Sequence, residues 1–199
     1  MGYTTILDII GSVIIGGFIL LILYRTNASA TENTYNNGSD LIVQEDITTI
    51  VQILENDFRK IGYCEDWTKI PDPTKAIIYA DSSSIKFLTD TRNNGTVDTL
   101  YYYLGSVNDL PNTPNPNDRC LYRQINGGIP QGISLGVTEF NMLYFGALGD
   151  TLSFPILTTG AISSMQITIR VENSEAYDST YVDAFWRQIR LAARNLRNR

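Results

Sequence analysis

One carboxylate lies inside the most apolar segment of this chain. Asp8 is the only charged side chain before Arg25 in the opening stretch MGYTTILDIIGSVIIGGFILLILYR. A carboxylate at the centre of a membrane helix costs about 2.5–3.5 kcal/mol. A buried charge persists in such surroundings only when an opposite charge pairs with it. The sequence therefore predicts a pairing role for Asp8.

A second candidate for chemistry is the acidic stretch DTRNNGTVD, residues 90–98. Asp90, Asn94 and Asp98 fall where a calcium loop places its ligands, and Gly95 falls where such a loop turns. Arg92 would however bring a cation into that cage, and the late glutamate is missing. Asn-Gly between two β-rich runs is also a strong hairpin signal. We therefore favour a hairpin turn over a calcium site and expect no bound metal.

Other motifs for catalysis or cofactor binding are missing. The chain has no histidine, no G-x-S-x-G, no phosphate-binding loop and no G-x-G-x-x-G. We expect neither an enzyme nor a cofactor. Two cysteines alone cannot build a thiolate metal cage. Outside the cytosol Cys64 and Cys120 would form a disulfide, and the alternative is two buried thiols.

Composition limits the architecture and the partners. The 199 residues suffice for one ordinary domain plus one long segment, and a net charge of −6 argues against nucleic acid as a partner. Twelve tyrosines and fifteen glycines suit strands and turns.

The apolar segment is long enough to cross a bilayer. Residues 3–24 would span about 33 Å as a helix. The small residues Gly11, Ser12, Gly16 and Gly17 allow close helix contacts, and Gly16-Gly17 is a point where the helix could melt. With Asp8, they favour a helix that packs against other copies of itself. A cleaved signal peptide is the alternative, since NASA at 27–30 resembles a cleavage site.

A second, amphipathic helix is predicted after a polar stretch. Ser39 or Asp40 can cap its start and Gly62 ends the pattern. We expect a nearly continuous rod with a weak point near Gly38. Its apolar stripe recurs at spacings of three and four: Val43, Ile47, Ile50, Val51, Leu54, Phe58 and Ile61.

The rest of the chain reads as an antiparallel sheet with turn-rich connections. The final segment fits either a helix or a strand, and its arginines 187, 190, 194, 197 and 199 could pair with an acidic helix flank. That flank comprises Glu45, Asp46, Glu55 and Asp57. The expected strands are residues 76–80, 84–88, 97–105, 120–125, 137–145 and 163–172.

The whole arrangement resembles type IV pilins and the pseudopilins of type II secretion. ILENDFRKIGYC, SIKFLTDTRNNGTVDTLYYYLG and RLAARNL look like the helix end, the first hairpin and the final strand of minor pilins of the PilW type. The resemblance implies an α+β fold in which a long hydrophobic and amphipathic helix packs on an antiparallel sheet. The expected segments are an apolar helix (1–24), an amphipathic continuation (25–62) and a globular antiparallel domain (63–199).

The resemblance also implies how such a subunit works. Gly2-Tyr3 would be the processing junction, and Tyr3 would begin the mature chain. The family has a glutamate four residues after that point, whereas Asp8 comes five residues after it. Subunits wait in the inner membrane and assemble with themselves and other pilin-like subunits into a filament at the cell surface, or a periplasmic pseudopilus. The carboxylate pairs with a neighbour's N-terminal amine.

Two other functions fit parts of the sequence. One is a membrane-anchored binding or enzyme domain that never polymerises. The other is a secreted, adhesin-like module that binds calcium through the 90–98 loop after its leader is removed.

Overall fold

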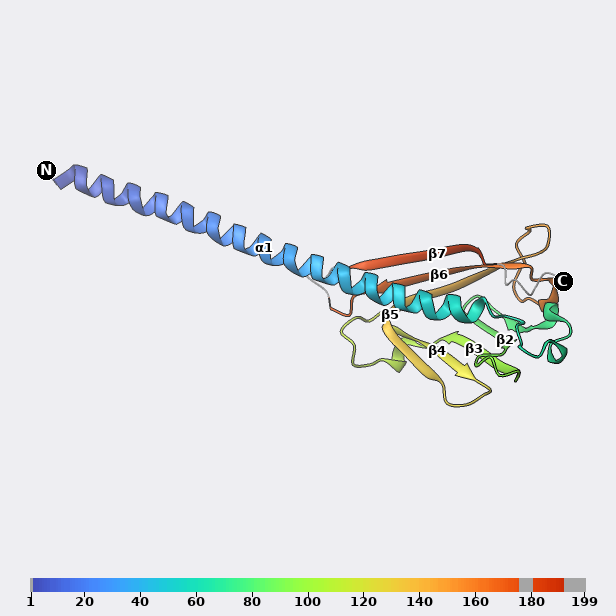
Figure 1. Ribbon diagram of the computed structural model, residues 1–199. Coiled ribbons are helices and arrows are strands. Elements are labelled where there is room, and N and C mark those ends of the chain that lie inside the picture. The colour runs from blue at the N-terminus through green and yellow to red at the C-terminus, as the bar shows by residue number, and fades with distance from the viewer. Residues whose placement is uncertain (1, 176–180, 192–199) are drawn as a thin grey trace. The chain divides into compact units, whose positions relative to one another are not determined.

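The computed structural model describes residues 2–175 and 181–191. The chain forms two compact units, Met1–Ser39 and Asp40–Arg199, and we call the second unit the head. Helix α1 (Gly2–Phe58) contributes residues to both units without a break at Gly38 (Figure 1). The α+β class expected from the sequence is thus present: one long N-terminal helix and an antiparallel sheet.

The part of α1 that belongs to the head, from Asp40 on, carries the predicted apolar stripe, and the structure confirms its burial. Val51 is half-buried, and the other stripe residues are buried: Val43, Ile47, Ile50, Leu54, Phe58 and Ile61. The helix ends at Phe58, three residues earlier than the stripe suggests. Its last turn tightens, because the N–H groups of Lys60 and Ile61 bond to carbonyls three residues back. The Gly62 N–H then donates to Leu88 O of the sheet at 2.9 Å.

Seven antiparallel strands follow, paired in chain order β1 to β7. Each of the six predicted strands is present, with the bounds of β5 the only ones among them to differ by more than one residue, and the ambiguous segment is a strand over its described part. The strands are β1 (Ile77–Ala80), β2 (Ser84–Thr89), β3 (Asp98–Leu104), β4 (Arg119–Ile125), β5 (Gln131–Phe145), β6 (Ser164–Glu172) and β7 (Asp183–Leu191).

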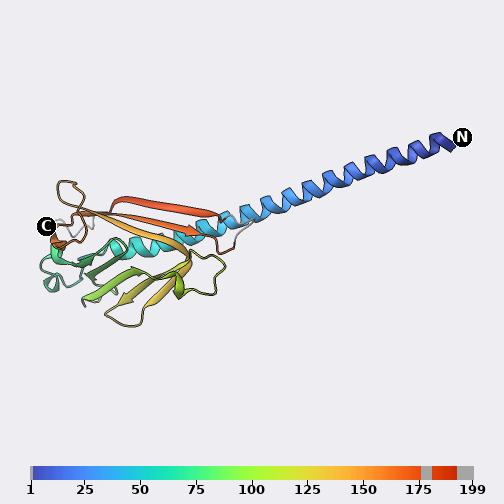
Figure 2. The same cartoon turned by 180° about the vertical axis from the view of Figure 1, so that it is seen from behind.

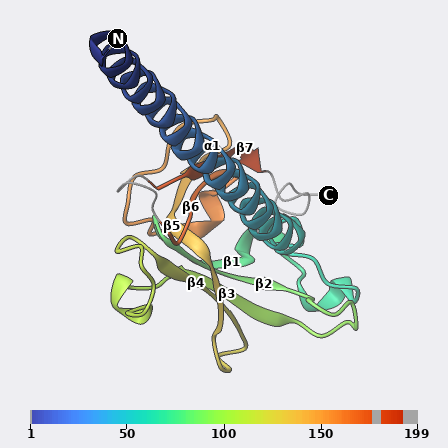
Figure 3. The ribbon, with the colours of Figure 1, turned by 90° about the vertical axis from the view of Figure 1, so that its left-hand side faces the viewer.

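The sheet curls around the part of α1 that belongs to the head, as the views from behind and along the helix show (Figures 2 and 3). Alternate side chains of β2 to β6 therefore face the helix and form one core with its stripe. The Phe58 ring lies 5.4 Å from the Phe87 ring and 5.5 Å from the Tyr102 ring, between centroids. These contacts join the end of α1 to β2 and β3.

Strand β5 begins at Gln131, six residues before the predicted start. The added residues include Gly132 and Gly136. These glycines interrupt the alternation of apolar and polar residues from which a strand is predicted. The pairing register shifts twice along β5, once toward β4 before Val137 and once toward β6 between Val137 and Glu139. Such irregularities bend a strand. In the curled sheet β5 lies between β4 on one side and β6 on the other (Figure 1).

Two acids of the helix flank that could have paired with the C-terminal arginines have other partners in the head. Glu55 pairs with Arg59 at 3.2 Å, and Asp57 pairs with Arg123 of β4 at 2.7 Å. Arginines 194, 197 and 199 lie outside the described residues.

Candidate functional site

The first unit exposes a continuous apolar helix surface. By length and composition this helix could cross a membrane. The exposed fraction is 87% for Tyr3 and at least 51% for each of the other large apolar side chains that follow it. They are Ile6, Leu7, Ile9, Ile10, Val13, Ile14, Ile15, Phe18, Ile19, Leu20, Leu21, Ile22, Leu23 and Tyr24. A contiguous apolar surface of this extent requires cover, by lipid or by other protein chains.

Asp8 stands on this surface without a partner. No hydrogen bond or ion pair joins its carboxylate to any of the described side chains, those of residues 2–175 and 181–187. The neighbouring Ser12 hydroxyl is occupied, since it donates to Ile9 O at 2.8 Å. Any group that neutralises Asp8 must therefore come from outside the described part of the chain.

Three glycines were expected to let helices approach each other. No atom lies within 4 Å of a Cβ built on Gly11, Gly16 or Gly17, so packing within the described chain does not require a glycine there. At about 100° per residue, Gly11 lies beside Asp8 on the helix surface, Gly16 flanks that face, and Gly17 lies opposite. The helix thus brings Asp8 and Gly11 together and separates Gly17 from them.

The 90–98 stretch is a hairpin connection whose carboxylates are already occupied. Asp90 accepts hydrogen bonds from the backbone N–H groups of Gly95 (2.7 Å), Asn94 (3.1 Å) and Glu65 (3.3 Å). Asp98 accepts from Thr91 and from Asn126. The predicted hairpin between β2 and β3 is confirmed. Because the carboxylates bond to different groups, Asp90, Asn94 and Asp98 do not form a calcium cage.

Hydrogen bonds from backbone N–H groups also lower the pKa of Asp90. Burial alone would raise its pKa, but the N–H groups of Asn94, Gly95 and Glu65 outweigh burial and hold the pKa below its usual value. A carboxylate with a lowered folded-state pKa stabilises the fold above its unfolded-state pKa, and that contribution disappears as the pH falls through the folded-state value.

Asp90→Asn should therefore destabilise the head more at pH 7 than at pH 3. The unfolded chain protonates Asp90 near pH 4, so the difference from wild type should be constant above about pH 5 and shrink below about pH 4. Urea titrations of both proteins at several pH values measure it. Asp150→Asn, which removes a carboxylate at an exposed position, is the control. A difference that grows toward low pH would contradict the assignment.

The predicted disulfide is absent: Cys64 and Cys120 are free, buried thiols. Residues 63 and 65 bond to Asp90, at the end of β2 next to the start of β3. Cys120 O accepts from the Gly105 N–H, just beyond the other end of β3. The seven residues of β3 separate the two ends by about 20 Å, and a disulfide needs Cα atoms less than about 7 Å apart.

A buried polar cluster that sequence reasoning missed joins α1 to the sheet. Tyr102 OH and Arg123 Nε both donate to Asp57 Oδ2, at 2.6 and 2.7 Å. Burial, together with the Asp57 charge, raises the pKa of Tyr102, so its hydroxyl stays protonated as a donor. The sequence did contain a sign that Asp57 is buried: Asp57 falls three residues after Leu54 and seven after Ile50, on the apolar stripe.

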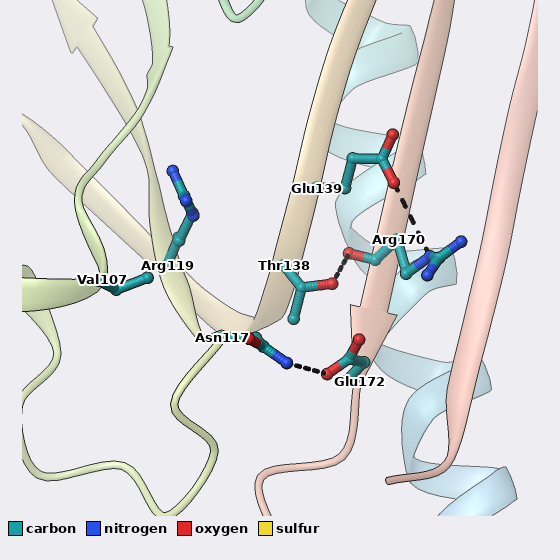
Figure 4. A pocket seen from close by; sticks show the side chains of 7 residues that line it. All are labelled: Val107, Asn117, Arg119, Thr138, Glu139, Arg170 and Glu172. Atoms are coloured by element: carbon teal, nitrogen blue, oxygen red, sulfur yellow. Dashed lines mark hydrogen bonds and ion pairs between the residues drawn. The ribbon is translucent and has the colours of Figure 1, made fainter.

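A polar cavity of about 270 Å³ lies over β4, β5 and β6, where β5 bends (Figure 4). Within the described residues, no hydrogen bond or ion pair involves the Arg119 side chain, whereas Arg170 lies 3.8 Å from Glu139. Asn117 faces Glu172, and Arg119 points away from both (Figure 4). The seven residues around the cavity are Val107, Asn117, Arg119, Thr138, Glu139, Arg170 and Glu172.

Comparison of the chain with protein-family models, with curated proteins and with solved structures gave no match in any of the three. A proposal for its function therefore rests on its own residues and their geometry.

Proposed function

We propose that this chain is a structural, non-enzymatic subunit of a pilin-like filament, held together by its N-terminal helix. One observation carries the proposal: an apolar helix surface, exposed from Tyr3 to Tyr24, bears a single unpartnered carboxylate at Asp8. Lipid would cover the apolar side chains but leave the charge unpaired. A bundle of such helices covers the same surface and can supply the opposite charge.

The proposed path has two stages. The subunit first resides in the inner membrane through residues 3–24, and it then moves into a filament, at the cell surface or as a periplasmic pseudopilus. In the filament Asp8 pairs with the N-terminal amine of a neighbouring subunit, as the resemblance to pilins implies. The gain on leaving the bilayer is up to about 3 kcal/mol, the cost of a carboxylate in the membrane. That energy corresponds to roughly a hundredfold change in an equilibrium constant.

Asp8→Ala should abolish or strongly reduce assembly, because the alanine variant is more stable in lipid and lacks the pairing charge. The measurement is negative-stain electron microscopy, with sedimentation, of full-length protein after detergent removal. Wild type should form helical filaments with this chain as the repeating unit. Glu32→Ala is the matched control, since Glu32 is exposed on the same helix beyond the apolar segment, and it should assemble normally.

Two results would contradict the proposal at different levels. Normal filaments from Asp8→Ala would remove Asp8 from the mechanism but leave assembly intact. Wild-type protein that never forms filaments, and instead re-enters lipid vesicles as single subunits, would favour a membrane-anchored binding domain. The polar cavity of the head would then be the first place to look for its ligand.

A further inference from the structure

One buried carboxylate oxygen of the head has no hydrogen-bond partner. Among the buried side-chain nitrogen and oxygen atoms of the described residues, only Asp118 Oδ1 is in this position. Asp118 is 4% exposed, and it forms no ion pair with the side chains that the structure describes, those of residues 2–175 and 181–187. A buried carboxylate is normally paired, hydrogen-bonded or bound to a metal ion. This oxygen therefore needs an explanation.

The loop that carries Asp118 is tied to a second carboxylate, that of Glu172. The loop Thr113–Asp118 holds Glu172, at the end of β6, through the Asn115 and Asn117 side-chain amides, which donate to Glu172 Oε2 at 3.0 and 3.4 Å. Burial raises the pKa of Asp118, and the Glu172 charge raises it further, against a hydrogen bond from Thr113. Glu172 likewise has no cationic partner among the described residues, since Arg119 points away from it (Figure 4). The Glu172 charge thus acts on Asp118, and no described side chain pairs a cation with either carboxylate.

We propose that Asp118 and Glu172 bind a calcium ion. The two carboxylates match its charge, and a cation between them satisfies the unpartnered Asp118 oxygen and removes the repulsion from Glu172. Within the described residues, three acidic or histidine ligands do not gather anywhere, so neutral oxygens must complete the shell. Asn117 and Glu172 line the polar cavity, so the proposal takes the Asn117 amide oxygen and water from that cavity as the neutral ligands.

Calcium fits this site better than magnesium. Calcium accepts six to eight oxygens in irregular geometry, whereas magnesium demands a near-ideal octahedron. The ligands come from an irregular loop and a strand end, which favours the flexible coordination of calcium. Sites with few carboxylates bind calcium with a dissociation constant on the order of 10⁻⁴–10⁻³ M. This proposal concerns the head and holds whether or not the chain assembles into filaments.

The test is isothermal calorimetry of detergent-solubilised full-length protein, stripped with EDTA, against CaCl₂ and MgCl₂. Calcium should bind at one site, raise the melting temperature, and bind more tightly than magnesium. Asp118→Asn and Glu172→Gln should each weaken calcium binding by about tenfold or more. Glu139→Gln is the matched control, because Glu139 lines the same cavity but pairs with Arg170, and it should bind calcium like wild type.

Three outcomes would overturn the proposal: no calcium binding by wild type at millimolar concentration, equal binding of magnesium, or unchanged calcium affinity in both variants. If Asp118→Asn does not fold, Glu172→Gln decides alone, since Glu172 is only half-buried.

Discussion

Arg123→Ala should lower the free energy of unfolding of the head by about 3 kcal/mol. Arg123 Nε lies 2.7 Å from Asp57 Oδ2, and the Asp57 side chain is only 7% exposed. Removing the guanidinium leaves the Asp57 charge buried, with Tyr102 OH as its remaining strong donor. Most of the lost stability comes from that uncompensated charge. Because the Arg123 side chain is 18% exposed, we expect a loss at the lower end of the range for breaking a buried ion pair, about 3–5 kcal/mol. Urea denaturation followed by tryptophan fluorescence measures the loss.

Two variants make this experiment specific. Arg119→Ala removes an arginine from the same strand that has no partner among the described residues, and it should cost less than about 0.5 kcal/mol. The double variant Asp57→Asn, Arg123→Gln removes both charges together and should be more stable than Arg123→Ala alone. Equal losses in the Arg119 and Arg123 variants would show that the buried pair does not hold α1 against the sheet.

Gly136→Ala should be the most damaging methyl addition in the sheet. Gly136 has φ +67°, and a Cβ built there would lie 2.2 Å from Glu172 O, a backbone atom that cannot move alone. We expect a loss of about 2–5 kcal/mol, combining the strain of a left-handed alanine with the clash against β6. Thermal unfolding of the full chain in detergent measures the change.

Gly127→Ala separates the two causes. Gly127 has nearly the same φ, +68°, but nothing lies within 4 Å of its added Cβ. Its alanine variant should therefore show the backbone strain alone, about 1–2 kcal/mol. The excess loss in Gly136→Ala then reports the contact between β5 and β6. If both variants lose the same stability, the close approach at Glu172 O does not matter to the fold.

The spacing of apolar residues correctly predicted a helix face and a strand. The stripe from Val43 to Ile61 predicted a buried helix face, and alternation from Met165 to Val171 predicted β6. Burial of one face follows from side-chain spacing in a regular element, so local sequence contains that information. The hairpin at Asn94-Gly95 was predictable for the same reason, because turn chemistry is local.

The local sequence pattern did not predict features that depend on residues far away in the chain. β5 was predicted too short, since Gly132 and Gly136 serve contacts with other strands rather than an apolar alternation. Cys64 and Cys120 were expected to bond because disulfides form in domains outside the cytosol, but β3 separates them. Asp57 was expected at a solvated flank, although its place on the stripe indicates burial.

The sequence by itself determined the apolar helix with its single carboxylate, the amphipathic face that follows, and the class of the head. Each depends on residue type and spacing along one element. Only the tertiary structure decided that Asp57 pairs with Arg123 and that Asp118 lies buried in a loop tied to Glu172. Those residues are 66 and 54 positions apart in the chain, and no periodicity relates them. They meet because the sheet curls around the helix and returns β6 to the loop before β4.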